Sequence, residues 1–382
     1  MDINSSDSQP GCQPYRLNGW VVSPFSQKTL AYLRYKGIPH QQQTPGVWRL
    51  MRTIQQQVGK AIMPTVETAG GDWLQDSSEI IDYFEQAYPE HSIEPQTPKQ
   101  QLVAHLLELH ADEWLVMASL WYRWKVPQNR DFIIAEFGRY ALPGMPVFIR
   151  NLMANSIRRT MMGYLPRFGI NDKTQQGVQK YCKQLLALLE DHFTQNKYFL
   201  GNRPCIGDFS FFGQLYAHLY RDQGSQHLFD NTPALRDWIN RLLLADGQEA
   251  NPANNPQYRF LPDDEIPNTL LPILELIFSE QMPFIATVVD NINQYVANKP
   301  DSQRVSRIVG EGDFSIGGVK GQRQQFSFVQ WKLQRCTRVW QQLDDQQKIP
   351  LEQWLHDIGG EQLLAIDIRH PLKRQNFSEV LA

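Results

Sequence analysis

The chain has 382 residues, of which 42% are apolar and 20% charged, the composition of a soluble globular protein with two or three domains. Its 37 basic and 40 acidic residues give a formal net charge of -3, so no overall field favours nucleic acid or an anionic membrane. Four scattered cysteines lack the spacing of a zinc site, a dithiol redox motif or a secreted disulfide framework: Cys12, Cys182, Cys205 and Cys336.

The chain also lacks sequence signals for export or membrane anchoring. Residues 1–14 are polar and predict a disordered tail, and no run reaches the roughly 18 apolar residues of a membrane helix. We therefore expect a cytoplasmic protein that has neither a membrane nor a nucleic acid as its partner.

A short strand and a helix follow this tail. The segment Tyr15–Val22 predicts the strand, and Ser23–Pro24 reads as a helix N-cap followed by proline at the first helical position. Apolar residues at helical spacing continue to the stop signal Gly37–Pro39. A serine hydroxyl at a helix N-terminus can donate a hydrogen bond to a thiolate, whose charge the helix dipole also favours. The alternative is that Ser23 only caps the helix, because Ser-Pro starts many helices.

The stretch Lys60–Pro89 carries several local signals in a short run. Pro64 stands before the alternating residues Thr65–Glu67, so it enters a strand where a missing amide hydrogen costs nothing. Gly70–Gly71 predicts a two-residue hairpin to a second strand, since both positions tolerate positive φ.

A helix follows this hairpin, and a less regular segment precedes it. Asp76 and Glu79 have the spacing of a capping box, which opens a helix at Ser77. The glutamine-rich residues 40–59 are only weakly periodic, and we expect one short helix there, over Val47–Ile54.

The pattern is helical from residue 98 to about 250. The proline-rich Pro89–Pro98 reads as a linker, and a long amphipathic helix then runs from Leu102 to Trp124. No cluster of further ligands accompanies the metal-binding residue types on this helix, so we expect no metal site. Those residues are His105, His110 and Glu113.

The segment 137–171 is basic and contains no acidic residue. Its arginines alternate with methionines and aromatic residues, which would suit the mouth of a pocket for anionic or flat apolar substrates. The interpretation that we favour is a solvated face, or docking against the acidic residues 262–265. The five arginines are Arg139, Arg150, Arg158, Arg159 and Arg167.

Residues 257–382, called the extension below, follow a linker expected at 251–256. Their Phe and Trp residues are too much apolar surface to stay in water, so we expect the extension to pack on the helical domain, around Trp121–Trp124 or the arginine-rich segment. The expected elements are a helix over Leu270–Val296 interrupted at Pro283, a hairpin over Phe314–Val319, and helices over Phe326–Leu343 and Pro350–Leu364.

Several of these motifs together resemble glutathione transferases. The strand-entry Pro64, the hairpin, and the acidic-plus-serine pair Asp76–Ser77 at a helix start are similar to the second half of that family's thioredoxin-like domain. The run Trp20–Lys28, with its Ser-Pro-Phe, looks like the first strand and helix of the tau-type enzymes, in which the serine is catalytic. The segment Tyr198–Gly213 is similar to the buried helix of the family's C-terminal domain, with Cys205 in place of the usual hydroxyl cap.

The resemblance covers about residues 15–245 and implies the fold. An α/β thioredoxin-like domain is expected at residues 15–90 and an all-helical C-terminal domain at residues 98–250. The extension adds a mostly helical region that the resemblance leaves without a role.

The resemblance also implies a role for each candidate site residue. Ser23 would stabilise the thiolate of glutathione, the co-substrate. The main chain of Met63, before Pro64, would pair with the cysteinyl part of glutathione like an added strand. At the γ-glutamyl head, Asp76 would meet the amino group and the helix start at Ser77 the carboxylate. Two further candidates for glutathione binding are Phe25 and Lys60, of which the lysine would lie near the glycyl carboxylate or else on the solvated surface.

The function that this resemblance implies is glutathione transfer to a small-molecule electrophile, by a homodimer with Asp76 near the partner chain. The alternative is a glutathione-binding or fold-only interaction protein without turnover, because the extension could close the acceptor pocket. A thiol-disulfide reductase is disfavoured, since Ser23 cannot form a mixed disulfide. No motif identifies the electrophile.

Overall fold

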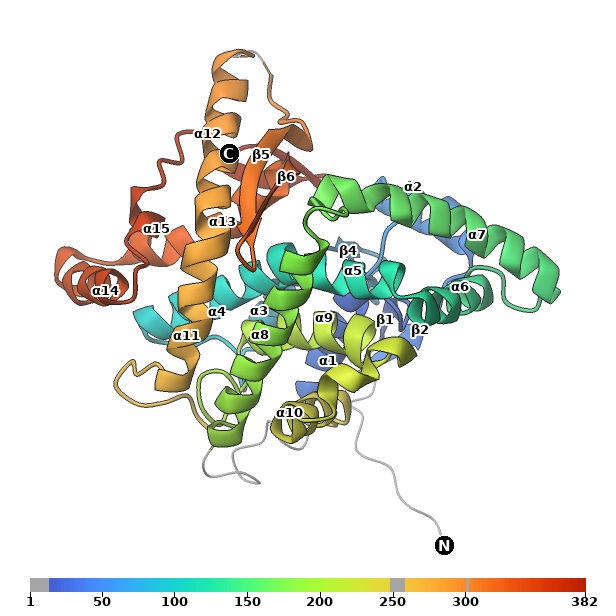
Figure 1. Ribbon diagram of the computed structural model, residues 1–382, viewed down its shortest axis with the longest axis horizontal. Coiled ribbons are helices and arrows are strands. Elements are labelled where there is room, and N and C mark those ends of the chain that lie inside the picture. The colour runs from blue at the N-terminus through green and yellow to red at the C-terminus, as the bar shows by residue number, and fades with distance from the viewer. Residues whose placement is uncertain (1–13, 248–257, 300–301) are drawn as a thin grey trace, which may run out of the picture.

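The computed structural model describes residues 14–247, 258–299 and 302–382 (Figure 1). Residues 1–13 of the expected N-terminal tail and the linker expected at 251–256 lie outside the described residues. The described chain forms an α/β domain, a helical domain and a mostly helical extension, so the predicted fold class is confirmed.

The α/β domain is built on a four-stranded sheet in the order β2-β1-β3-β4. β1 runs parallel to β2 and antiparallel to β3, and β3 pairs antiparallel with β4. The connection from β1 to β2 passes through α1, since parallel strands need a crossover. The elements are β1 (Tyr15–Asn18), α1 (Pro24–Tyr35), β2 (His40–Gln43), η1 (Arg49–Ile54), α2 (Gln55–Val58), β3 (Thr65–Glu67), β4 (Trp73–Gln75) and α3 (Ser77–Ala87).

Two details of this sheet differ from the expectation. The edge strand β2 has no alternating apolar pattern, and it forms because its pairing with β1 uses main-chain groups only. The turn between β3 and β4 is longer than the two residues expected. Thr68 N–H donates to Asp72 O at 2.9 Å across the turn, and Gly71 supplies the positive φ of 87° within it.

The starts of α1 and α3 follow the predicted caps. Ser23 Oγ accepts a main-chain N–H of the first turn of α1 at 3.3 Å, and Pro24 occupies the first helical position. Asp76 Oδ1 accepts the N–H of Ser78 at 2.9 Å and caps α3. The predicted capping box is only half formed. The Glu79 carboxylate does not accept the N–H of Asp76, because it pairs with Arg374 of the extension instead.

The helical domain contains the predicted long helix, which runs without a break from α4 through the π-type turn η2 to α5. The start of α9 has a capping box, in which the Asp208 carboxylate accepts the N–H of Cys205 at 2.9 Å. The elements are α4 (Pro98–His110), η2 (Ala111–Leu115), α5 (Val116–Lys125), α6 (Pro127–Ala141), α7 (Val147–Tyr164), η3 (Leu165–Phe168), α8 (Gln175–Gln195), α9 (Ile206–Gln214), η4 (Leu215–Tyr220), η5 (Gln223–Phe229) and α10 (Pro233–Leu243).

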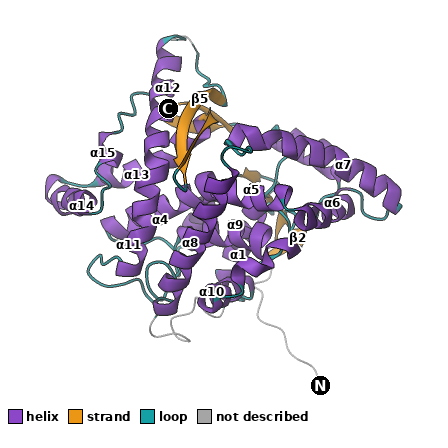
Figure 2. Cartoon of the chain, viewed as in Figure 1, coloured by secondary structure: helices purple, strands orange, loops and turns teal. Residues whose placement is uncertain are grey.

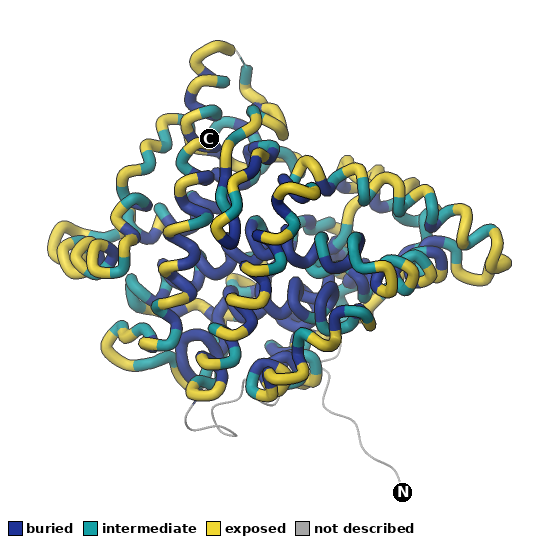
Figure 3. The backbone as a smooth tube through the Cα atoms, viewed as in Figure 1, coloured by how far each residue is buried: buried dark blue, intermediate teal, exposed yellow. Residues whose placement is uncertain are grey.

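The arginine-rich segment lies largely on α6 and α7, which project from the body of the protein (Figure 2). Along α7 only Ala154 is buried, as the exposed colouring of this part shows in Figure 3. The exposed α7 agrees with the solvated face in the favoured interpretation, and the docking on residues 262–265 that it offered as an alternative is wrong. The Asp264 carboxylate instead accepts the N–H groups of Lys99 and Gln100, at 2.9 and 3.0 Å, and so caps α4.

The extension consists of a long helical stretch, two hairpins and shorter helices. Pro283 lies in the first turn of α12, so the stretch continues past the predicted interruption. The hairpin β5–β6 turns at Gly317–Gly318, both at positive φ, whereas the hairpin β7–β8 has no sequence signal that predicts it. The elements are η6 (Asn268–Leu270), α11 (Leu271–Leu276), η7 (Ile277–Gln281), α12 (Met282–Ala297), β5 (Ile308–Ile316), β6 (Val319–Phe326), α13 (Ser327–Gln342), α14 (Asp345–Asp357), α15 (Gln362–Ala365), β7 (Leu372–Gln375) and β8 (Ser378–Leu381).

The extension and the two domains share one apolar core. Helix α13 packs along α4 (Figure 1), and the Trp114 ring of η2 lies 6.1 Å from the Phe284 ring of α12. The extension therefore packs mainly against α4 and Trp114, whereas the expected places are Trp121–Trp124 or the arginine-rich segment. Within the arginine-rich segment, Phe168 meets Phe326 of the extension at 5.4 Å between ring centroids.

One stretch of the described chain, Asn268–Ala297, is long and apolar enough to cross a membrane by length and composition. In the folded chain 61% of its most apolar window is buried. Core helices of soluble proteins pass the same test, and the buried face of α12 belongs to the shared core, so we interpret this stretch as a core helix.

Docking of the extension can be tested at Gly177 of α8. A Cβ at this position would lie 2.2 Å from Ile316 O, so Gly177→Ala must push the β5–β6 hairpin away. We expect a loss of about 1–3 kcal/mol in the free energy of unfolding, measured in urea, as for other overpacked sites. The matched control is Gly163→Ala, since a Cβ there meets no atom within 4 Å. Equal stability of the two variants would contradict close docking of the hairpin.

Candidate functional site

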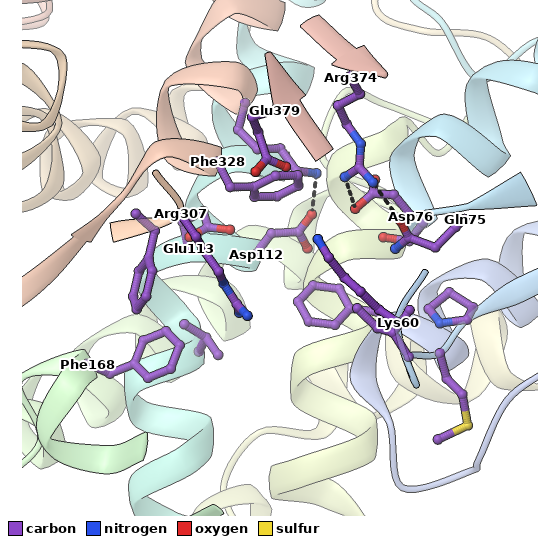
Figure 4. Close-up of a pocket in the computed structure, with 18 residues that line it drawn as sticks. Lys60, Gln75, Asp76, Asp112, Glu113, Phe168, Arg307, Phe328, Arg374 and Glu379 are labelled. Atoms are coloured by element: carbon purple, nitrogen blue, oxygen red, sulfur yellow. Dashed lines mark hydrogen bonds and ion pairs between the residues drawn. The ribbon is translucent and has the colours of Figure 1, made fainter. Parts of the chain in front are cut away.

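A cavity of about 240 Å³ lies where the α/β domain, the helical domain and the extension meet (Figure 4). It is smaller than the roughly 300–1,000 Å³ of most small-molecule sites, so a larger ligand must extend out of its mouth. Six of the seven candidate site residues line it, namely Phe25, Lys60, Met63, Pro64, Asp76 and Ser77.

Met63 lines the cavity just before strand β3. The bond between Met63 and Pro64 is cis. Among the described residues no hydrogen bond is made by the Met63 N–H or C=O, so both groups remain available to an extended peptide. Such pairing needs main-chain groups only.

The start of α3 forms one end of the cavity. Asp76 adopts φ 79° and ψ 130°, a conformation that costs a non-glycine residue on the order of 1–3 kcal/mol. This backbone turns the carboxylate onto the helix N-terminus, where Oδ1 accepts the N–H groups of Ser78 and Glu79 at 2.9 and 3.4 Å. Ser77, the first helical residue, stays buried beside the cavity, where helical N–H groups attract anions.

Arg374 of the extension reaches the same helix start from β7. Its guanidinium lies 3.4 Å from Asp76 Oδ2 and 3.2 Å from Glu79 Oε2, and it also donates to the Gln75 side chain (Figure 4). Only 6% of the Arg374 side chain is exposed. Burial raises the pKa of Glu79 to about 7, against the lowering effect of the Arg374 charge.

A buried group of charges lies behind the cavity. Lys28 Nζ of α1 contacts Glu108 Oε1 and Asp112 Oδ2, each at 2.8 Å. Lys332 Nζ of α13 contacts the same two oxygens at 3.1 and 2.7 Å. Arg335 of α13 contacts Glu108 Oε2 at 2.8 Å. Burial alone would raise the pKa of Glu108, but the three cations outweigh it and hold that pKa well below its usual range.

Glu113 is a further carboxyl group in the cavity wall. Burial raises its pKa to about 7, although the charge of Arg323 acts in the opposite direction. Arg323 donates to the main-chain oxygen of Glu113 at 3.3 Å, and no ion pair to the Glu113 carboxyl occurs among the described residues. A carboxyl group with this pKa changes its charge near neutral pH.

Of the side chains considered for a metal, His110 has other partners. His110 lies between the Gln281 amide oxygen of the extension and the Tyr181 hydroxyl, at 2.7 Å from each, and burial lowers its pKa to about 4. Within the described part of the chain no group of three or more His, Cys, Asp or Glu side chains could hold a metal ion.

Ser23 is the one candidate site residue that does not line the cavity, although Phe25, two residues later, does. Its hydroxyl oxygen accepts a hydrogen bond as the cap of α1, which leaves the hydroxyl hydrogen free for an acceptor. The exposed Lys60 Nζ lies at the mouth and donates to the main-chain oxygen of Phe377 in the extension at 3.1 Å.

The extension supplies a third of the cavity wall, and no sequence motif predicts this. Phe328 and Lys332 lie one helical turn apart on α13. This spacing indicates that they share a helix face, but it does not predict which element that face contacts. Asp112, Glu113 and Phe168 are likewise ordinary residues of helical patterns. The cavity residues from the extension are Arg307, Phe326, Phe328, Lys332, Arg374 and Glu379.

Two family models match the chain. The model described as the N-terminal domain of glutathione S-transferase matches residues 17–92, and the one described as its C-terminal domain matches residues 152–244. No curated protein matches the chain.

Solved structures of glutathione transferases resemble the chain weakly. One from Rhodospirillum rubrum is 15% identical, with a TM-score of 0.40, and the match covers 66% of this chain and 96% of that one. One from Methylobacterium radiotolerans, in complex with glutathione sulfonate, is 19% identical over 67% of this chain and 100% of its own, with a TM-score of 0.38. One from Phanerochaete chrysosporium is 13% identical over 61% and 97%, with a TM-score of 0.43.

The buried charges predict a large effect of Glu108→Gln. This variant keeps the shape of the side chain but leaves Lys28, Lys332 and Arg335 with one carboxylate fewer. We expect a loss of about 3–5 kcal/mol in the free energy of unfolding in urea, as for other broken buried ion pairs. The exposed Glu352→Gln is the control, and a similar stability for both variants would refute this account.

Glu113 predicts a pH dependence of stability. Its folded pKa of about 7 lies above the ordinary value of 4.5, so the stability it contributes is present at low pH and is lost as pH rises through about 7. In Glu113→Gln this loss disappears, and the variant should match wild type near pH 4 and exceed it near pH 8. Urea unfolding at both pH values, with Glu352→Gln as control, measures this. Parallel profiles for wild type and Glu113→Gln would show that the carboxyl is not perturbed.

Proposed function

The chain belongs to the glutathione S-transferase superfamily, and on that premise we propose that it binds glutathione in the cavity and transfers it to an electrophile. One observation carries the proposal. The free main-chain groups of Met63, the helix start at Ser77 and an apolar wall from three parts of the chain all face the same cavity.

Glutathione would lie extended along this cavity. Its cysteinyl main chain would pair with Met63, whose N–H and C=O have no other partner among the described residues. The γ-glutamyl carboxylate would sit at the N-terminus of α3, beside Ser77. At the other end the glycyl carboxylate would reach the exposed Lys60 at the mouth.

Ser23 would act on the glutathione sulfur. Because its oxygen accepts the helix-capping hydrogen bond, its hydroxyl hydrogen can donate to a thiolate. A thiol pKa of about 8.5 needs to fall by only one to two units for the thiolate to dominate near neutral pH. The positive end of the α1 dipole adds to this stabilisation.

The acceptor would lie against the apolar side of the cavity, formed by Val116, Phe168, Phe326 and Phe328. The thiolate forms a carbon–sulfur bond with the electrophilic carbon, the leaving group departs with its electron pair, and the thiol proton passes to solvent. Since the cavity is small and two of these phenylalanines belong to the extension, small or flat electrophiles fit best.

A second candidate is a glutathione-binding protein without turnover. It is favoured by the position of Ser23, which lies outside the residues that line the cavity. Binding with no detectable transfer to any electrophile would select this candidate over the transferase.

Glutathione binding is tested by titration calorimetry with Ser77→Ala. Losing a hydrogen bond to a charged group costs roughly 1.5–3 kcal/mol, so we expect affinity to fall by at least about tenfold. Ser156→Ala, on the exposed face of α7, is the matched control and should bind like wild type. No heat with wild type, or unchanged affinity in Ser77→Ala, would contradict the binding mode.

The role of Ser23 is tested by turnover of Ser23→Ala with a generic aryl halide. Because the hydroxyl acts on the sulfur and not on the ends of the tripeptide, kcat should fall by roughly 10- to 100-fold while glutathione affinity stays unchanged. The absorbance of the bound thiolate should titrate at higher pH in the variant. Equal turnover by wild type and Ser23→Ala would show that a residue other than Ser23 donates the hydrogen bond to the thiolate.

A further inference from the structure

The Asp76 carboxylate has no free oxygen in this fold. Oδ1 accepts the N–H groups of Ser78 and Glu79 at the start of α3, and Oδ2 pairs with Arg374 at 3.4 Å. The resemblance assigns this carboxylate to the amino group of a bound γ-glutamyl head. In this chain Arg374 of the extension already pairs with this carboxylate (Figure 4).

Arg374 is a built part of the site and not a loose surface charge. Its guanidinium lies 5.5 Å from the ring centroids of both Phe328 and Trp331, and its side chain is 6% exposed. The β7 strand that carries it is anchored to α13, because Gln334 exchanges two hydrogen bonds of 2.8 Å with the main chain of Leu372. Displacing Arg374 would therefore break a packed and hydrogen-bonded hairpin.

The pairing of Asp76 with Arg374 disfavours a ligand ammonium at this carboxylate. The ammonium would come close to the Arg374 guanidinium and would find Asp76 already paired, although Glu379 stands opposite Arg374 in the β7–β8 pair. A ligand carboxylate beside Ser77 would still meet the N-terminus of α3.

We propose that Arg374 pairs with Asp76 where the ammonium group of a ligand would otherwise bind. The site then binds the carboxylate of the ligand's head group and not its amine. This inference rests on the proposed glutathione site. The ligand class it predicts is that of γ-glutamyl-type thiols in which the α-amine is absent or blocked, bound at least as well as glutathione itself.

Calorimetry with two ligands tests the proposal on the full chain. The ligands are glutathione and its des-amino analogue, in which a glutaryl group replaces the γ-glutamyl group. Wild type should bind the two with affinities within about threefold, because the amine has no partner. In Arg374→Met the freed Asp76 should favour glutathione over the analogue by about tenfold or more. Lys373→Met, an exposed neighbour on the same strand, is the control and should behave like wild type.

The outcomes separate this inference from the proposed function. Tenfold weaker binding of the analogue to wild type would overturn the inference and leave the glutathione site standing, with the amine bound elsewhere, for example at Glu379. Binding of neither ligand to wild type would overturn both. If Arg374→Met does not fold, the comparison of the two ligands on wild type still tests whether the amine contributes to binding, since it needs no variant.

Discussion

Two lysines from distant parts of the chain share one pair of buried carboxylates, and the rest of the structure depends on this arrangement. Lys28 comes from the α/β domain, Lys332 from the extension, and Glu108 and Asp112 from the long helix between them. Buried charges are tolerated only when each is compensated. Removing the extension would therefore leave Glu108 and Asp112 with too few cations, and the three parts form one cooperative unit.

This constraint fixes α13, and α13 in turn shapes the site. Its Phe328 and Lys332 line the cavity, and its Gln334 holds the hairpin that brings Arg374 onto α3. The resemblance places a partner chain near Asp76, but here the same chain covers that carboxylate. A homodimer whose partner chain contacts Asp76 would require the β7–β8 hairpin to move away from this carboxylate.

Local signals in the sequence predict the parts of the site that lie within one element. Ser23–Pro24 and Asp76 are helix caps with fixed residue preferences, and Pro64 marks a strand entry, so their positions follow from short-range chemistry. Strand β2 has only polar side chains and forms through main-chain pairing, which leaves no pattern to read. The pairing of Arg374 with Asp76 joins residues 298 positions apart. The spacing of apolar residues along a sequence predicts helices and strands, but it does not predict a contact between such distant side chains. The resemblance ends near residue 245 and could not predict it either.

We propose that the extension forms one wall of a glutathione site and pairs with its acidic residue, Asp76. A crystal structure of the full chain grown with glutathione would test this. We expect the cysteinyl main chain paired with Met63, the γ-glutamyl carboxylate at Ser77, and Arg374 still on Asp76. Glutathione with its ammonium on Asp76 and a displaced β7–β8 hairpin, or a cavity without glutathione at saturating concentration, would contradict it.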